Sequence, residues 1–230
     1  MNIEVWSDVV CPWCYIGKRR LESALKQFEH RDDVTVTWRS FELNPNTPHR
    51  VEGPLVEALA SKYGVPVSQA EQMMQRVTDA AAGEGITMRF DIAQTGNTFD
   101  AHRLIHHASE SGLRSEMKER LLAACFTEGQ AISDRAVLAS LAADVGLDRD
   151  TALAMLESEG HAEAVRAEER QAQAYGAGGV PFFVIDQKYG VSGAQPSETL
   201  LQVLNTAHSE RAPAVPTASD ACDEDGCAVP

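Results

Sequence analysis

The chain reads Ser7-Asp8-Val9-Val10-Cys11-Pro12-Trp13-Cys14 near its start. Residues 3–8 are rich in β-forming side chains and predict a short strand that leads into the cysteines. After them, Leu21, Leu25 and Phe28 recur at helical spacing, which predicts a helix that ends near residue 30. The two cysteines are therefore expected at the point where a strand meets the N-terminus of a helix.

The rest of the chain extends this beginning into an α/β protein. Alternating β-formers from Val34 toward Leu43 predict a second strand. A long helical pattern follows, and glycines predict where its helices end, at residues 64–66, 83–85, 112, 129 and 146. Two strands around a turn at 186–188 then precede a last helix that Ser197 is expected to cap. The predicted parts are a βαβ unit (1–50), a helical insertion domain (51–177), a ββα unit (178–208) and a flexible tail (209–230).

The composition is that of an acidic globular protein. Of its 230 residues 43% are hydrophobic and 23% charged, and the formal net charge is -14. No apolar stretch approaches the roughly 20 residues of a membrane-spanning helix, and binding to a polyanion needs clustered Lys and Arg. We therefore expect a soluble protein with no nucleic-acid or membrane partner. Since the first residues read directly as a strand, with no apolar leader before them, we also expect a cytoplasmic location.

Five cysteines form two close pairs and a singleton: Cys11, Cys14, Cys125, Cys222 and Cys227. In a reducing compartment, close pairs indicate redox chemistry or metal binding rather than a structural disulfide. A cysteine attacks as the thiolate, and the free N–H groups of a helix N-terminus stabilise that charge. Cys11 is accordingly predicted to be the nucleophile, and Cys14, one turn deeper, to be the resolving thiol.

The residues between the two cysteines fit this interpretation. Pro12 suits the first helical turn, and Trp13 is expected to be exposed beside the nucleophile, where it helps to hold peptide substrates. The alternative is that Cys11 and Cys14 form half of a zinc site in a binding or redox-sensing module, shared with the other close pair. A pair that opens a long helix after a strand favours redox chemistry, so no metal is expected.

Further stretches carry a resemblance to a known family: Phe41-Glu42-Leu43-Asn44-Pro45, Asn97-Thr98-Phe99-Asp100-Ala101-His102-Arg103-Leu104 and Gly179-Val180-Pro181-Phe182. With the cysteine stretch, they resemble the FrnE-type branch of the DsbA-like family over roughly residues 1–208. The resemblance implies a thioredoxin fold with an inserted α-helical domain. It implies that Val180 and Pro181 form a cis-proline loop that faces the cysteines and pairs with an extended substrate. His102 then either lies near the redox cleft and tunes the thiolate or is a structural histidine.

The same resemblance implies a thiol–disulfide oxidoreductase acting as reductase, isomerase or oxidase on disulfide-containing proteins or small thiols. Its only redox group would be its own disulfide. The alternative is a glutathione-dependent isomerase or transferase, because 2-hydroxychromene-2-carboxylate isomerases and kappa-class glutathione transferases carry a similar Asn-Thr-x-x-Ala-His-Arg-Leu helix. Those enzymes resemble this chain except that serine stands at the nucleophile position. Cys11 and Cys14 therefore favour the oxidoreductase, with glutathione as a candidate co-substrate, while monomer or dimer and the direction of electron flow stay open.

Cys222 and Cys227 have four residues between them and can close a small disulfide loop in the tail. Our hypothesis is that this auxiliary pair exchanges with Cys11 and Cys14, since a tethered dithiol has a high effective concentration. The alternative is a passive tail disulfide or a metal clip. Cys125 lies in an apolar helical run, which predicts a buried, inert thiol.

Two other groups near the motifs have chemical potential. His102 and His106 are spaced i, i+4 with His107 beside them, as in a two-histidine metal site, but no third ligand is indicated. Asp8 precedes Cys11 by three residues and is expected to order the turn from strand to helix. Its carboxylate is also expected to raise the thiol pKa.

Overall fold

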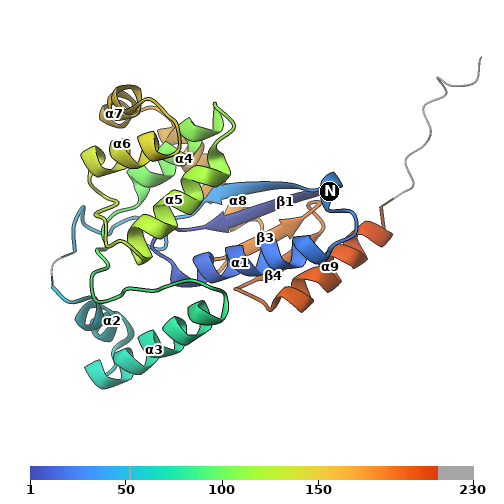
Figure 1. Cartoon of the computed structure of the whole chain (residues 1–230), viewed down its shortest axis with the longest axis horizontal. Coiled ribbons are helices and arrows are strands. Elements are labelled where there is room, and N and C mark those ends of the chain that lie inside the picture. Colours follow the sequence, from blue (N-terminus) through green and yellow to red (C-terminus); the bar gives the residue numbers. More distant parts are fainter. Residues whose placement is uncertain (52, 212–230) are drawn as a thin grey trace, which may run out of the picture.

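The structure is a computed structural model that describes residues 1–51 and 53–211. At its centre lies a four-stranded sheet in the order β2-β1-β3-β4 (Figure 1). The strands are β1 (Asn2–Ser7), β2 (Thr35–Ser40), β3 (Phe182–Ile185) and β4 (Tyr189–Ser192). β1 pairs in parallel with β2 and antiparallel with β3, and β3 pairs antiparallel with β4. A βαβ unit is thus joined to a ββα unit, which confirms the expected thioredoxin fold.

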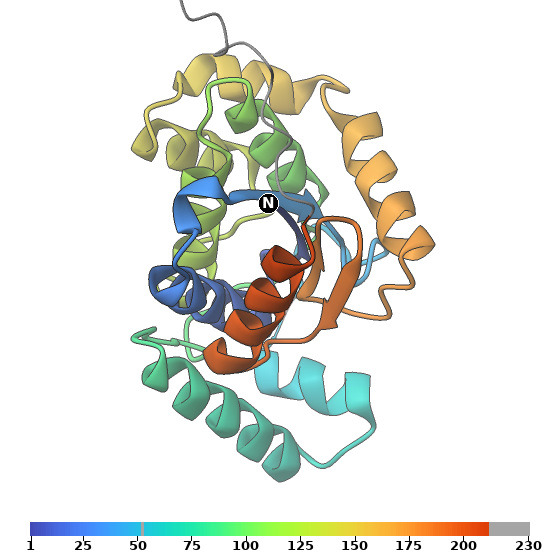
Figure 2. The same cartoon turned by 90° about the vertical axis from the view of Figure 1, so that its right-hand side faces the viewer.

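Side chains that alternate along the central strands build a different core on each face of the sheet. Ile3 and Val5 of β1 pack with α1 (Pro12–Gln27) and α9 (Ser197–Ser209) on one face. Trp6, next to Val5, packs on the opposite face near α8 (Ala162–Ala174). Figure 2 shows α1 and α9 together on one side of the sheet and α8 on the other. Because helices cover both faces of the sheet, side chains on both sides of β1 are buried.

Between β2 and β3 the described residues form α2 (Leu55–Tyr63), α3 (Val67–Gly83), α4 (Phe99–Ser109), α5 (Arg114–Phe126), α6 (Arg135–Asp144), α7 (Arg149–Glu157) and α8. These helices do not form one block. Figure 1 shows α2 and α3 on one side of α1 and α4 to α7 on the other. The expected glycine breaks are confirmed, because the glycines next to the helix ends adopt the left-handed conformation that glycine tolerates best: Gly64, Gly85, Gly112, Gly129 and Gly146.

The largest core of the described residues joins α1 to this second group of helices. Tyr15 and Ile16 of α1 pack there in one cluster with Leu104 of α4 and Leu121 of α5. The first turn of α1 therefore lies where the sheet and the helical insertion meet. Any chemistry at that turn is shaped by both parts of the chain.

Two of the expected boundaries are wrong by about three residues. α1 ends at Gln27 rather than near residue 30, because a separate short 3-10 turn follows. β2 ends at Ser40 rather than near Leu43. The N–H of Leu43 donates to the Asp8 carboxylate instead of a neighbouring strand, so the chain leaves the sheet there.

The second half of the fold contains one wrong expectation. The turn between β3 and β4 forms as predicted, with Asp186 and Gln187 at positive φ. Ser197, however, does not cap α9, because Pro196 occupies the N-cap position and no side chain accepts a hydrogen bond there. Ser197 instead is the first helical residue, since the fixed φ of proline already directs the chain into the helix.

In the part of the chain that the structure describes, no helix is long and apolar enough to cross a membrane. The predicted tail pair, Cys222 and Cys227, lies outside the described residues.

Candidate active site

The cysteine motif forms the first turn of α1. Cys11 is the N-cap residue and Pro12 occupies the start of the helix. The N–H of Cys14 donates to the carbonyl of Cys11 over 3.0 Å and closes the turn. Trp13 is 41% exposed, as predicted, whereas Cys11 and Cys14 are 5% and 1% exposed. Cys11 is therefore the more accessible of two largely buried cysteines.

The two thiols differ in acidity. The hydrogen bond from the Cys14 thiol, helped by the N–H groups of Cys14 and Trp13, outweighs burial and holds the pKa of Cys11 below its ordinary value. Burial, followed by the interaction with Cys11, raises the pKa of Cys14 well above its ordinary value. The charge of Asp8 raises the pKa of Cys11, as the sequence predicts, but this effect is smaller. The surroundings therefore favour the thiolate at Cys11 and the protonated thiol at Cys14.

A second loop faces Cys11. The peptide bond between Val180 and Pro181 is cis, as expected, and the Cys11 thiol donates to the Val180 carbonyl with an Sγ to oxygen distance of 3.6 Å. Gly17 of α1 makes this close approach possible, because a Cβ at that position would lie 2.9 Å from Cγ of Pro181. Sequence reasoning missed Gly17, although a glycine within a helical pattern is a signal of close packing.

Asp8 and His102 form a buried pair behind the motif. One oxygen of Asp8 lies 3.2 Å from Nε2 of His102 and accepts from the N–H of Val9 over 2.7 Å, while the other accepts from the N–H of Leu43 over 2.8 Å. Burial opposes ionisation of Asp8, but the bond from His102, the Leu43 N–H and the charge of Lys118 together lower its pKa. Asp8 therefore orders the turn, as expected, and His102 supports Asp8.

Lys118 of α5 is a site residue that sequence reasoning missed. It is 1% exposed, and its ammonium group donates to the carbonyl of Ser7 over 3.1 Å. Burial lowers the pKa of Lys118, and the negative charges of Cys14, Asp8 and Cys11 oppose that shift. A signal was present, since Lys118 stands on the same helical stripe as the buried Leu121, Leu122 and Cys125. A lysine among these apolar residues predicts a buried ammonium group, which needs hydrogen-bond acceptors or negative charges beside it.

A cavity of about 410 Å³ opens beside the motif. Asp8 and Val10 line it on the side of the redox turn, and Leu43, Leu55 and Leu59 line it from the next strand end and α2. The lining is mainly apolar with a few polar groups, which is typical of sites for small molecules and peptide side chains. The cavity is therefore a candidate substrate subsite.

Cys125 lies apart from this chemistry. It is fully buried, and burial raises the pKa of its thiol to about 12. The sequence-based expectation of a buried, inert cysteine is confirmed in its structural part. A thiol that stays protonated at every physiological pH is a poor nucleophile.

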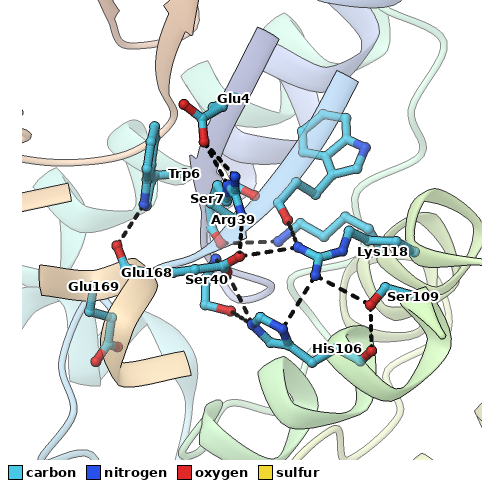
Figure 3. A network of polar contacts seen from close by, with 12 residues as sticks. Glu4, Trp6, Ser7, Arg39, Ser40, His106, Ser109, Lys118, Glu168 and Glu169 are labelled. Atoms are coloured by element: carbon cyan, nitrogen blue, oxygen red, sulfur yellow. Dashed lines mark hydrogen bonds and ion pairs between the residues drawn. The ribbon is translucent and has the colours of Figure 1, made fainter. Parts of the chain in front are cut away.

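A polar network centred on Glu168 of α8 ties the helices to the sheet (Figure 3). Its carboxylate accepts from Arg39 over 2.8 Å, from the N–H of Ser40 over 2.6 Å and from Arg114 over 3.2 Å, and it lies 3.1 Å from Nε2 of His106. Burial raises its pKa, but these partners, His106 first, lower it far more. His106 is committed to this network, so it does not join His102 in a metal site.

Comparison with known proteins finds a matching family and several similar proteins. Residues 2–205 match the family described as DSBA-like thioredoxin domain. A probable DsbA oxidoreductase from Streptomyces coelicolor has a similar structure, with a TM-score of 0.89 and 43% identity over 100% of this chain and 99% of that chain. The uncharacterized protein YwbO of Bacillus subtilis is 32% identical over 149 residues, which are 64% of this chain and 68% of YwbO.

A more distant structure shares the fold alone. The cytosolic disulfide reductase DsbM from Pseudomonas aeruginosa, solved with GSH, is 19% identical with a TM-score of 0.64, over 91% of this chain and 100% of that chain. Its likeness shows that the arrangement of a βαβ unit, inserted helices and a ββα unit recurs across dissimilar sequences.

Proposed function

The chain belongs to the DSBA-like thioredoxin domain family, and on this premise we propose that it catalyses thiol–disulfide exchange with Cys11 and Cys14. In the reducing direction, the Cys11 thiolate attacks one sulfur of a substrate disulfide, and the other substrate sulfur leaves as a thiolate. Cys14 then loses its proton and attacks the sulfur of Cys11. The second substrate thiol leaves, the enzyme keeps the Cys11–Cys14 disulfide, and two electrons have passed to the substrate. The reverse sequence oxidises a dithiol.

The observation that carries this proposal is the unequal pair of thiols at one helix N-terminus. The Cys14 thiol stabilises a thiolate on Cys11, while Cys14 is itself kept protonated until a mixed disulfide forms. The Val180 carbonyl beside Cys11 supports an extended substrate segment that pairs with this loop. These are the features that a two-step exchange requires.

Titration of the reduced protein tests the proposal. We expect the Cys11 thiolate to form below the pKa of about 8.5 of an unperturbed thiol, because the Cys14 thiol and two backbone N–H groups bind its charge. The ultraviolet absorbance of the thiolate reports the titration, and a Cys222→Ser/Cys227→Ser variant removes the tail thiols. Insulin-disulfide reduction should rise with pH through the same pKa and then level off. A normal thiol pKa without any insulin reduction would overturn the proposal.

Lys118→Met tests how Cys14 becomes a nucleophile. The buried ammonium favours the Cys14 thiolate, so its removal should raise the pKa of Cys14 and slow resolution of the mixed disulfide. A rise of about one pKa unit corresponds to roughly tenfold slower resolution at neutral pH. Stopped-flow measurement of resolution against pH should show the profile displaced upward. Lys26→Met, at an exposed lysine in the last turn of α1, is the matched control and should leave the profile unchanged.

The cavity beside Asp8 and Val10 supports a proposal for the substrate class. Its volume of about 410 Å³ and mainly apolar lining suit an extended peptide or a small thiol such as glutathione. This cavity does not separate the oxidoreductase from the glutathione-dependent isomerase, because either enzyme could bind glutathione there. The complete dithiol of Cys11 and Cys14 is what favours the oxidoreductase. Exchange with Cys222 and Cys227, and a cytoplasmic location, stay predictions.

A further inference from the structure

A second group of ligating side chains lies away from the cysteines, between α4 and α8. His107 stands in the last turn of α4, Glu110 follows that helix directly, and His161 is the N-cap residue that precedes α8. Their ligand atoms all lie within 4.8 Å of one another. The first two residues are close in sequence, whereas His161 comes from another segment, so the tertiary structure brings them together.

The distances within this group do not suit hydrogen bonds. Nδ1 of His107 lies 3.4 Å from one oxygen of Glu110, and Nε2 of His161 lies 3.6 Å from the other. Nitrogen-to-oxygen hydrogen bonds are about 2.7–3.2 Å long. Bonds of about 2.0–2.2 Å to a tetrahedral zinc ion place neighbouring ligands roughly 3.3–3.6 Å apart. The two separations are longer than direct hydrogen bonds and fall in the range expected for ligands that share one ion.

The segment that carries His161 is held in place by a buried arginine. Arg103 is 2% exposed and donates to the carbonyls of Gly160 over 2.8 Å and Met155 over 2.9 Å, and also to that of Ser158. Asp100 binds the same guanidinium over 2.6 Å, which offsets its positive charge. A fixed segment reduces the entropy that ligand binding would otherwise cost.

His161 itself has an unusual backbone. Its φ is 61°, in the left-handed region that few residues other than glycine adopt, although histidine, like asparagine and aspartate, enters it more often than most. Such conformations persist where the surrounding structure imposes them, and they are frequent at functional sites. The neighbouring histidines have other tasks, because His106 belongs to the Glu168 network and His102 pairs with Asp8. His107 and His161, by contrast, each place a ring nitrogen near the Glu110 carboxylate.

We propose that His107, Glu110 and His161 bind one divalent transition-metal ion of the zinc class. Two imidazole nitrogens and one carboxylate are a ligand set that zinc accepts, and they leave the fourth position to water. The ligand atoms of the two imidazoles and the carboxylate already lie within 4.8 Å of one another. The ion would link the end of α4 to the start of α8, the helices that carry His102 and Glu168, and would stabilise the protein by mass action.

Zinc chloride titration by calorimetry tests this site. The full-length Cys222→Ser/Cys227→Ser protein is used with Cys11 and Cys14 oxidised to a disulfide, so that these sulfurs do not bind the metal. We expect one zinc ion per chain and a higher melting temperature with zinc. Affinity should fall at least tenfold in His107→Ala and in His161→Asn, since asparagine tolerates the left-handed backbone.

His49→Ala, at an exposed histidine outside the group, is the matched control and should bind zinc like the parent protein. Melting temperatures without zinc show whether each variant is folded. Absence of zinc binding in the parent, or equal binding in both site variants, would overturn the proposal. Because insulin reduction by Cys11 and Cys14 is measured separately, neither result affects the proposed oxidoreductase.

Discussion

Cys14→Ser is expected to hold the enzyme on its substrate as a stable mixed disulfide, whereas Cys11→Ser is expected to reduce insulin-disulfide cleavage to the uncatalysed background. In the proposed mechanism the Cys11 thiolate is the attacking group, so serine in its place leaves no sulfur to form the intermediate. Serine at position 14 leaves the first step intact and removes only the second nucleophile. The two variants should thus fail at different steps.

Non-reducing electrophoresis and mass spectrometry distinguish these outcomes. Both variants are made in a Cys222→Ser/Cys227→Ser background, so that the tail thiols cannot resolve the intermediate. Cys125→Ser is the control for the loss of a thiol, and its activity should be unchanged in the folded protein because Cys125 is fully buried. Accumulation of the mixed disulfide in Cys11→Ser rather than in Cys14→Ser would reverse the assigned roles.

Glu168→Ala should cost about 3–5 kcal/mol of folding free energy, the usual effect of removing one partner from a buried ionic cluster. The loss leaves Arg39, Arg114 and the N–H of Ser40 without their shared acceptor in the junction between β2, α5 and α8. Urea denaturation at neutral pH measures the change. Glu163→Ala, on the exposed side of the same helix, is the matched control and should change stability by no more than about 0.5 kcal/mol.

The Glu168 carboxylate also predicts how the folding stability changes at acidic pH. The pKa of Glu168 is lower in the folded protein than in the unfolded chain, so its stabilisation is complete above the unfolded value of about 4.3. That contribution is lost as the pH falls further, toward the folded pKa. Glu168→Gln removes the titrating group and should flatten the decline in stability below about pH 4. An equally steep decline in Glu168→Gln would show that other carboxylates set the acid limit.

Several features followed from local sequence patterns. The strand before Cys11, the helix after it and the turn at residues 186–188 rest on short periodicities and turn chemistry. The boundaries near Gln27 and Ser40 were missed by about three residues, because side-chain contacts such as that of Asp8 with Leu43 decide where the backbone leaves a strand. The two separate groups of helices around α1 were not expected, since periodicity does not reveal how helices pack.

The sequence by itself determined where the cysteine pair lies: a strand that ends in Cys-Pro-Trp-Cys places Cys11 at a helix N-terminus, and the resemblance placed Val180 and Pro181 opposite. Only the tertiary structure decided which charges lie around those sulfurs. Lys118 and His102 come from the helical insertion, about a hundred residues along the chain from Ser7 and Asp8. Electrostatic energy depends on separation in space and on burial rather than on sequence spacing. For that reason folding, and not the motif, brings a buried cation and an Asp–His pair to the two cysteines.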